Sequence, residues 1–175
     1  MRRVAALLRA VNVGGVKLLM SDFRRVLAGL GYEDPETLVA SGNAVFGTDR
    51  PAAAVEAAVK SALARELGLA TEVFVRDHAE LAAVIAANPF PDFARESPSK
   101  LMAVFLADEP PQDLSPLERW ATAGEMIARG PRCLYIGYPE GAGRSKLANA
   151  RGTPATAGTA RNWNTVGKLH ALTVG

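Results

Sequence analysis

The chain has 175 residues, of which 49% are hydrophobic and 22% charged, and its formal net charge is +2. This length suffices to bury a core without disulfides or a metal, and the composition is that of a globular protein. No apolar run approaches the roughly 20 residues that span a bilayer, which excludes a membrane-spanning protein.

Apolar spacing predicts the order β-α-β-β-α-β for the first half. The expected elements are strands at 2–9, 36–40, 44–46 and 71–75, with helices from Ser21 to Gly31 and from Pro51 to Gly68. Ser41-Gly42-Asn43 has the residue types that a tight hairpin needs for positive φ. This order is that of a ferredoxin-like unit, in which both helices cover one face of an antiparallel sheet.

The second half is expected to repeat most of this order, as β-α-β-β-α. A helix opened by Asp77 ends at Asn88-Pro89, and the expected elements beyond it are strands at 100–107, 125–128 and 133–138, a helix capped by Ser115, and a last helix at 159–172. We therefore predict an α+β fold of two tandem ferredoxin-like units, with mainly antiparallel sheets. Their ranges are 1–88 and 100–175, joined by a proline-rich connection at 89–99, and the whole could also count as one compact domain.

Charge is unevenly distributed along the sequence. Residues 1–20 contain four basic residues and residues 141–175 contain five, with no acidic residue in either range. All 18 acidic residues lie between 21 and 140, against 11 basic ones. If the two basic ends fold side by side, their fields add and would attract a phosphate, a nucleotide or nucleic acid. The alternative is that both ends pair with acids of the middle segment.

The cysteine and histidine content limits the chemistry that the sequence can support. Cys133 is the single cysteine, so no intrachain disulfide can form, and only His78 and His170 could join it in a metal site. The first apolar run ends at Arg9, too early for a secretory signal. We expect a protein of the reducing cytoplasm with no metal and no cofactor. Whether it is an enzyme stays open, because the sequence shows no paired carboxylates or catalytic triad.

The loop from Arg9 to Lys17 is the strongest candidate for a binding site. Gly14 and Gly15 let a ligand approach the main chain, while Arg9, Asn12 and Lys17 offer hydrogen-bond donors and positive charge. We therefore expect this loop to bind an anion through a nest of backbone amides. An ordinary strand-to-helix turn would need the same glycines, so that alternative stays open.

Further candidate residues lie in two short turns and in the last expected helix. Ser41 and Asn43 could line the site beside the first loop, although turn chemistry alone explains them. Arg144 and Lys146 could hold an anion in the Gly-rich loop 141–146. In the last helix, polar residues recur at helical spacing on one side and are Arg161, Asn164, Thr165 and Lys168. Asn162, on the flank of this row, could orient a ligand or cap the neighbouring backbone.

Five motifs occur in a recognisable order along the chain. They are Arg9-Ala-Val-Asn-Val-Gly-Gly, Ser41-Gly-Asn, Asn88-Pro89-Phe90, Gly143-Arg-Ser-Lys146 and Thr159-Ala-Arg-Asn-Trp-Asn-Thr165. Together they resemble the bacterial family known as domain of unknown function 1697, over nearly the whole chain. The resemblance implies a small cytosolic α+β protein with tandem ferredoxin-like units. It brings no activity, substrate or catalytic residue with it.

The leading hypothesis is a small anionic, phosphate-bearing ligand bound where the Arg9–Lys17 loop meets the basic C-terminal segment. One alternative is a module that binds nucleic-acid backbone, although the strand at 2–9 lacks the aromatic residues with which ferredoxin-like sheets stack RNA bases. The other alternative is a protein-interaction or oligomerisation domain, for which Trp163, Phe90 and Phe93 are the cues.

Overall fold

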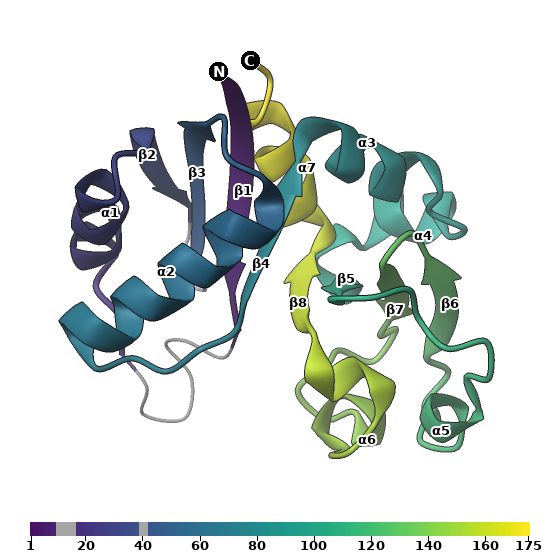
Figure 1. Cartoon of the computed structure of the whole chain (residues 1–175). Coiled ribbons are helices and arrows are strands. Elements are labelled where there is room, and N and C mark those ends of the chain that lie inside the picture. Colours follow the sequence, from purple (N-terminus) through teal and green to yellow (C-terminus); the bar gives the residue numbers. More distant parts are fainter. Residues whose placement is uncertain (10–16, 39–41) are drawn as a thin grey trace. The chain divides into compact units, whose positions relative to one another are not determined.

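The computed structural model in Figure 1 describes residues 1–9, 17–38 and 42–175. The chain divides into a first unit, residues 1–81 with 169–175, and a second unit, residues 82–168. The passage into the second unit lies within α3 (His78–Ala86), and the return lies within α7 (Trp163–Leu172). The domain boundaries expected from the sequence, at 88 and 100, stay a prediction.

The described residues of the first unit form a four-stranded antiparallel sheet. Its strands, in the spatial order β2-β3-β1-β4, are β1 (Arg2–Leu8), β2 (Glu33–Leu38), β3 (Asn43–Thr48) and β4 (Val73–Asp77). Two helices, α1 (Met20–Gly29) and α2 (Ala52–Leu67), cover one face of this sheet (Figure 1). Their apolar sides pack with alternate strand residues such as Phe46 into one core. The predicted order of six elements is confirmed for this unit.

Local sequence signals explain both ends of α2 but not the start of α1. Pro51 precedes α2, and Gly68 ends it in a left-handed conformation with φ of 64°, as expected for a glycine after a helix. The predicted cap of α1 at Ser21 is wrong. The amide of Phe23 donates to the carbonyl of Leu19 at 3.0 Å, so the first turn begins earlier and Ser21 lies inside the helix.

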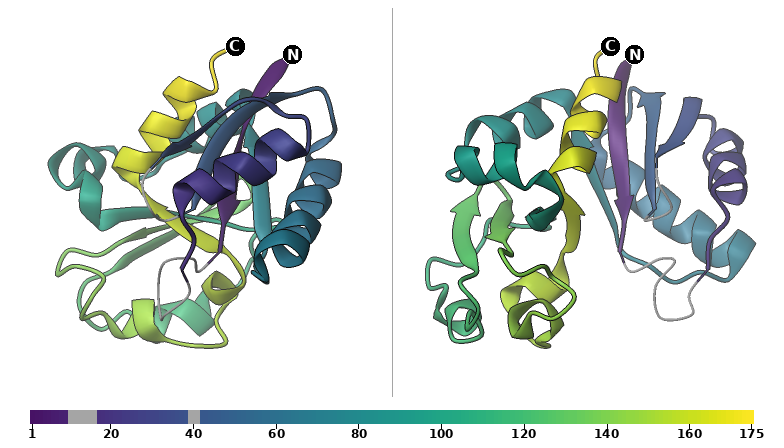
Figure 2. Two further views of the ribbon diagram at one scale, coloured as in Figure 1. Left: turned by 90° about the vertical axis from the view of Figure 1, so that its left-hand side faces the viewer. Right: turned by 180° about the vertical axis from the view of Figure 1, so that it is seen from behind.

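The C-terminal residues 169–175 complete the first unit. The Arg3 side chain on β1 donates from Nε to the carbonyl of Leu172 at 3.2 Å, and Figure 2 shows the two chain ends near each other. The rings of His78 and His170 stack with their centroids 4.2 Å apart, and Nδ1 of His78 lies 3.1 Å from the Thr173 hydroxyl. These contacts join the end of α7 to the start of α3.

The second unit contains another four-stranded antiparallel sheet, in the order β6-β7-β5-β8. Its strands are β5 (Leu101–Phe105), β6 (Met126–Gly130), β7 (Cys133–Gly137) and β8 (Thr159–Asn162). Its short helices are α4 (Pro91–Glu96), α5 (Ser115–Glu118), α6 (Lys146–Asn149) and the 3₁₀ turns η1 (Pro98–Lys100) and η2 (Pro154–Ala157). The chain is therefore an α+β protein with two antiparallel sheets.

Three details of the second unit differ from the sequence prediction. The connection at 89–99 is mostly helical, because it contains α4 and η1. Ser115 is not the cap of α5, because it is the first residue of the helix and Leu114 occupies the cap position. The last helix does not begin at Thr159. Residues 159–162 form β8, which pairs antiparallel with β5, and α7 begins only at Trp163.

The two faces of the second sheet are covered differently. On one face the Tyr135 hydroxyl donates to the carbonyl of Val84 in α3 at 2.6 Å, and the ring of Trp163 lies 6.3 Å from that of Tyr135. The opposite face carries Met102 and Ile136, which are directly paired across β5 and β7. The segment between β7 and β8 covers this second face. None of the helices formed by the described residues is long and apolar enough to cross a membrane.

Candidate functional site

Part of the predicted binding loop lies outside the described residues. Four of the candidate residues lie outside the described residues, and they are Asn12, Gly14, Gly15 and Ser41. Among the others, Arg9, Lys17 and Asn43 belong to the first unit, while the remaining candidates belong to the second. A ligand shared by the two groups stays a prediction from the sequence.

The two basic residues that flank the loop are exposed. The backbone of Arg9 is fixed, because its amide donates to the Glu72 carbonyl at 3.1 Å and its carbonyl accepts from the Thr71 hydroxyl at 2.6 Å. Lys17 lines a wide hollow together with Asp22. The carboxylate of Asp22 offsets the positive charge there, which weakens the case for an anion at that position.

Both described asparagine candidates have structural hydrogen bonds. Asn43 is fully buried and donates from Nδ2 to the carbonyl of Leu38 at 2.9 Å, which closes the β2–β3 hairpin. Asn162 accepts a hydrogen bond of 3.0 Å from the amide of Thr165, as expected of a residue that caps a helix. The capping role predicted for Asn162 is confirmed, and it explains why α7 begins at Trp163.

Arg161 is buried in β8 and does not belong to a helical row of cations. It pairs across the sheet with Ala103, and its guanidinium donates to the Thr159 hydroxyl at 2.5 Å and to the Ala160 carbonyl at 2.9 Å. Burial lowers the pKa of Arg161 to about 10, so the side chain remains charged at neutral pH. The predicted row of Arg161, Asn164, Thr165 and Lys168 is wrong at its first member.

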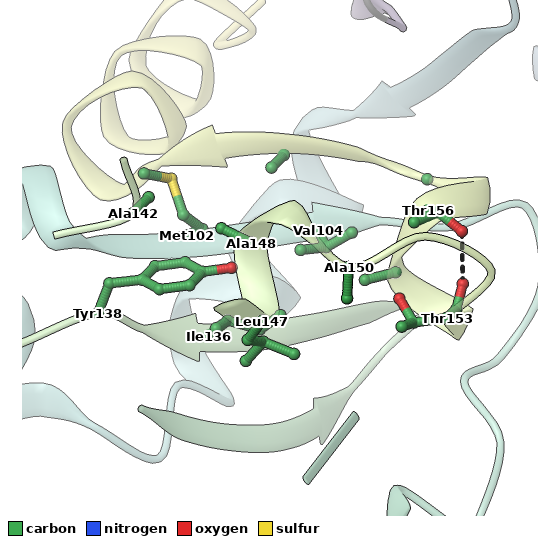
Figure 3. A pocket seen from close by; sticks show the side chains of 13 residues that line it. Met102, Val104, Ile136, Tyr138, Ala142, Leu147, Ala148, Ala150, Thr153 and Thr156 are labelled. Atoms are coloured by element: carbon green, nitrogen blue, oxygen red, sulfur yellow. Dashed lines mark hydrogen bonds between the residues drawn. The ribbon is translucent and has the colours of Figure 1, made fainter. Parts of the chain in front are cut away.

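A cavity that sequence reasoning missed lies beside Arg144 and Lys146. Its volume is about 250 Å³, and it lies between the second sheet and residues 138–158, which we call the cover segment (Figure 3). The strands contribute Met102, Val104, Ile136 and Ala160 to its wall. The cover segment contributes Tyr138, Ala142, Leu147, Ala148, Ala150, Thr153, Ala155, Thr156 and Gly158. Most of this wall is apolar.

The cover segment combines small residues with positive charge. Nine of its 21 residues are glycine or alanine, which leaves space between the segment and the sheet. It carries Arg144, Lys146 and Arg151, all exposed, against one acidic residue, Glu140. Lys168, the remaining cation of the C-terminal range, is exposed on α7. The cavity is therefore an apolar space beneath a basic surface segment.

A partly buried polar contact fixes the cover segment. Ser145, which is almost fully buried, donates from its hydroxyl to Oε2 of Glu125 at 2.5 Å and accepts from the amide of Ala148 at 3.2 Å. Burial raises the pKa of Glu125, but the hydrogen bonds from Ser145 and from the amide of Ala123 outweigh this effect, so the net shift is downward. Glu125 thus stays ionised and holds the start of α6 in place.

Tyr138 and Thr153 bring hydroxyl groups to the cavity. Each residue is only 6% exposed, and among the described residues neither side-chain hydroxyl has a hydrogen-bond partner. In Figure 3 the Tyr138 ring extends along the cavity from one end, and Thr153 lies at the other end. Burial, with a further contribution from the charge of Glu125, raises the pKa of Tyr138 to about 12, so its hydroxyl is protonated and can donate.

The sequence held one signal for this cavity. The glycine- and alanine-rich stretch after residue 138 follows a strongly apolar strand, and small residues facing a large apolar strand leave volume. The cavity itself is lined by residues far apart in the sequence, such as Met102 and Ala160. Among the described residues, no three His, Cys, Asp or Glu side chains gather where they could hold a metal ion.

A family model described as protein of unknown function (DUF1697) matches residues 1–135. The chain belongs to this family. The predicted resemblance is therefore confirmed over residues 1–135, while the motifs at 143–146 and 159–165 lie beyond the matched residues. The match includes β1 to β6 and ends within β7, while the cover segment of this DUF1697 chain lies beyond the matched residues.

One solved structure shares the fold of this DUF1697 chain. It is the conserved bacterial protein SP0830 from Streptococcus pneumoniae, which is similar with a TM-score of 0.74 over 98% of each chain, at 20% sequence identity. At that identity the likeness shows a common fold alone. No curated protein matches the sequence.

Proposed function

We propose that the protein binds a small anionic ligand with an apolar part, in the cavity beneath the cover segment. The observation that carries this proposal is the position of an apolar cavity directly under a surface segment with a net positive charge. An engineered apolar cavity of about 150 Å³ accommodates benzene, so 250 Å³ suits a ligand on the order of ten heavy atoms.

The three cations of the cover segment act at a distance. Arg144, Lys146 and Arg151 are exposed, and none of them lines the cavity. Their field raises the local concentration of anions and increases the association rate, an effect that salt screens. The apolar wall then supplies most of the binding free energy, because it removes apolar ligand surface from water.

A thermal-shift screen with a blocking variant tests this proposal. The compounds are small carboxylates and phosphate esters with one apolar group, with inorganic phosphate for comparison. At 100 times its Kd a ligand stabilises the protein by about 2.7 kcal/mol, which raises the Tm of a chain of this size by about 5–11 °C. Ala160→Trp, which fills the exposed mouth of the cavity, should abolish this shift.

Ala157→Trp is the matched control, because Ala157 is exposed on η2 and does not line the cavity. This variant should retain the full thermal shift. A shift that survives in Ala160→Trp would place the ligand elsewhere, and the absence of a shift with every compound would refute the proposal. The double charge reversal Arg144→Glu with Lys146→Glu should weaken binding most at low salt.

The same variants separate the nucleic-acid alternative. If the cover segment bound nucleic-acid backbone, binding of DNA or RNA would fall steeply with salt and would be lost in the charge-reversal variant. Ala160→Trp would leave such binding intact, because the exposed cations that would contact the phosphates do not line the cavity. This pattern would replace the small-ligand proposal.

We also propose that the two units are diverged copies of one ferredoxin-like arrangement. Their sheet orders correspond strand by strand, β2-β3-β1-β4 in the first unit and β6-β7-β5-β8 in the second. The helix that would follow the third strand of the second unit is reduced to the cover segment with α6 and η2. The proposed compartment is the reducing cytoplasm, where the buried Cys133 would remain a thiol.

A further inference from the structure

Two hydroxyl groups, those of Tyr138 and Thr153, line a cavity whose wall is otherwise mostly apolar. Among the described residues the one side-chain polar atom that is fully buried without a partner is Nε1 of Trp120, so the hydroxyl oxygens that line the cavity reach its open space. Tyr138 and Thr153 are both more than nine-tenths buried, and among the described residues their hydroxyls have no partner. Thr156, by contrast, is exposed and its hydroxyl donates to the Thr153 carbonyl at 2.7 Å. The two unpaired hydroxyls are available to a ligand.

The two hydroxyls lie at opposite ends of the cavity. Figure 3 shows Tyr138 entering from one end and Thr153 at the other, with Val104, Leu147 and Ala150 between them. A ligand that satisfies both must present a hydrogen-bonding group at each end and an apolar middle. A purely apolar ligand would leave both hydroxyls unpaired, and a fully polar one would leave the apolar wall without contact.

The two ends of the cavity differ in the charged residues that lie near them. Glu125 and Tyr138 directly adjoin the paired residues Met126 and Gly137 of β6 and β7, so the carboxylate that Ser145 holds places its negative charge near Tyr138. An anionic group beside Tyr138 would be repelled by Glu125, whereas a neutral hydroxyl or carbonyl would not. Thr153 instead follows Arg151 in the sequence by two residues, and no acidic residue lies between 141 and 175. The Thr153 end is therefore the better place for an anionic group.

We infer that the ligand is a small molecule with an apolar middle, a neutral oxygen group bound by the Tyr138 hydroxyl, and an anionic group bound by the Thr153 hydroxyl. A para-hydroxylated aromatic acid has this pattern and fits the volume. This inference rests on the proposed function and adds the orientation and the functional groups of the ligand.

Three probes that differ by one group each test the inference by NMR titration. They are 4-hydroxybenzoate, benzoate and phenol, and the methyl group of Met102 in the cavity wall reports occupancy. Wild type should bind 4-hydroxybenzoate about 2- to 12-fold more tightly than benzoate, the range expected of one neutral hydrogen bond. The advantage over phenol should be about tenfold or more, because the lost group is charged.

Variants then assign each end of the ligand. Tyr138→Phe should remove the preference for 4-hydroxybenzoate over benzoate and leave the preference over phenol. Thr153→Val should remove the preference for 4-hydroxybenzoate over phenol and leave the preference over benzoate. Tyr32→Phe in the first unit, which alters another buried tyrosine, should change neither preference.

Two results would overturn the inference and leave the proposed function standing. In the first, the probes bind and Ala160→Trp excludes them, but Tyr138→Phe and Thr153→Val keep wild-type preferences. In the second, the two variants lose the opposite preferences, which would invert the orientation. Failure of all three probes to bind would also overturn the inference, whereas the proposed function would be refuted only if every anion of the thermal-shift screen failed too.

Discussion

Gly158→Ala tests whether the close packing of the start of β8 against the end of β5 requires a glycine at position 158. A Cβ atom at position 158 would lie 2.3 Å from the carbonyl oxygen of Phe105 and 2.8 Å from Cδ2 of Leu106. Ordinary contacts begin at 3.4 Å, so the first of these is short by 3.4 − 2.3 = 1.1 Å. The obstacle is backbone, so the start of β8 must move away from β5, beside the Phe105–Thr159 pair.

Overpacking of this kind costs about 1–3 kcal/mol, and the backbone clash places Gly158→Ala near the upper end. A loss of about 2–3 kcal/mol lowers the Tm by about 4–12 °C in a chain of this size. Both tryptophans, Trp120 and Trp163, lie in the second unit, so tryptophan fluorescence during urea unfolding follows that unit selectively.

Gly143→Ala is the matched control for this measurement. Gly143 is exposed in the same cover segment, and no atom lies within 4 Å of the Cβ position that alanine would occupy. Its unfolding free energy should stay within about 0.5 kcal/mol of wild type. If Gly158→Ala were equally neutral, the close approach of β8 to β5, and with it the described shape of the cavity, would be refuted.

Three further predictions concern the polar contacts of the second unit. Ser145→Ala removes the cap of α6 and the hydrogen bond to Glu125, and should lower the unfolding free energy by about 1 kcal/mol in urea titrations. Because the folded-state pKa of Glu125 is depressed, its contribution to stability is present above its ordinary pKa of 4.5 and is lost as pH falls through the folded value. Glu125→Gln should therefore flatten the acid side of the stability profile, and an unchanged acid limb would contradict this. Tyr135→Phe removes the 2.6 Å hydrogen bond to Val84 and should cost about 0.5–1.5 kcal/mol, followed by tryptophan fluorescence, with Tyr32→Phe in the first unit as the control.

Elements with strong local signals could be predicted from the sequence. For α2, the helical spacing is visible in the apolar residues Val55, Val59, Leu63 and Leu67. Its two ends are marked by Pro51 and Gly68. After Arg2 and Arg3, β1 is a continuously apolar run from Val4 to Leu8, as expected of a central strand. In each case the residues that determine the element lie within the element or next to it.

The start of α7 and the cavity could not be predicted in this way. β8 has the sequence Thr-Ala-Arg-Asn, whose polar residues suit a helix surface as well as a strand, and its conformation depends on pairing with β5 more than 50 residues away. The same pairing buries Arg161, which the sequence places in a solvent-facing row. The cavity is lined by residues between 102 and 160, and a sequence pattern within one element cannot show that residues so far apart come together.

The discontinuity of the first unit has a consequence for biosynthesis. Residues 169–175, with Leu172 bound by Arg3 and His170 stacked on His78, are translated after the entire second unit. The second unit is a continuous stretch, so all of its residues are available to fold while the first unit still lacks its last segment. The nascent protein therefore carries an unfinished N-terminal unit, without the partners of Arg3 and His78, until the end of α7 has been synthesised.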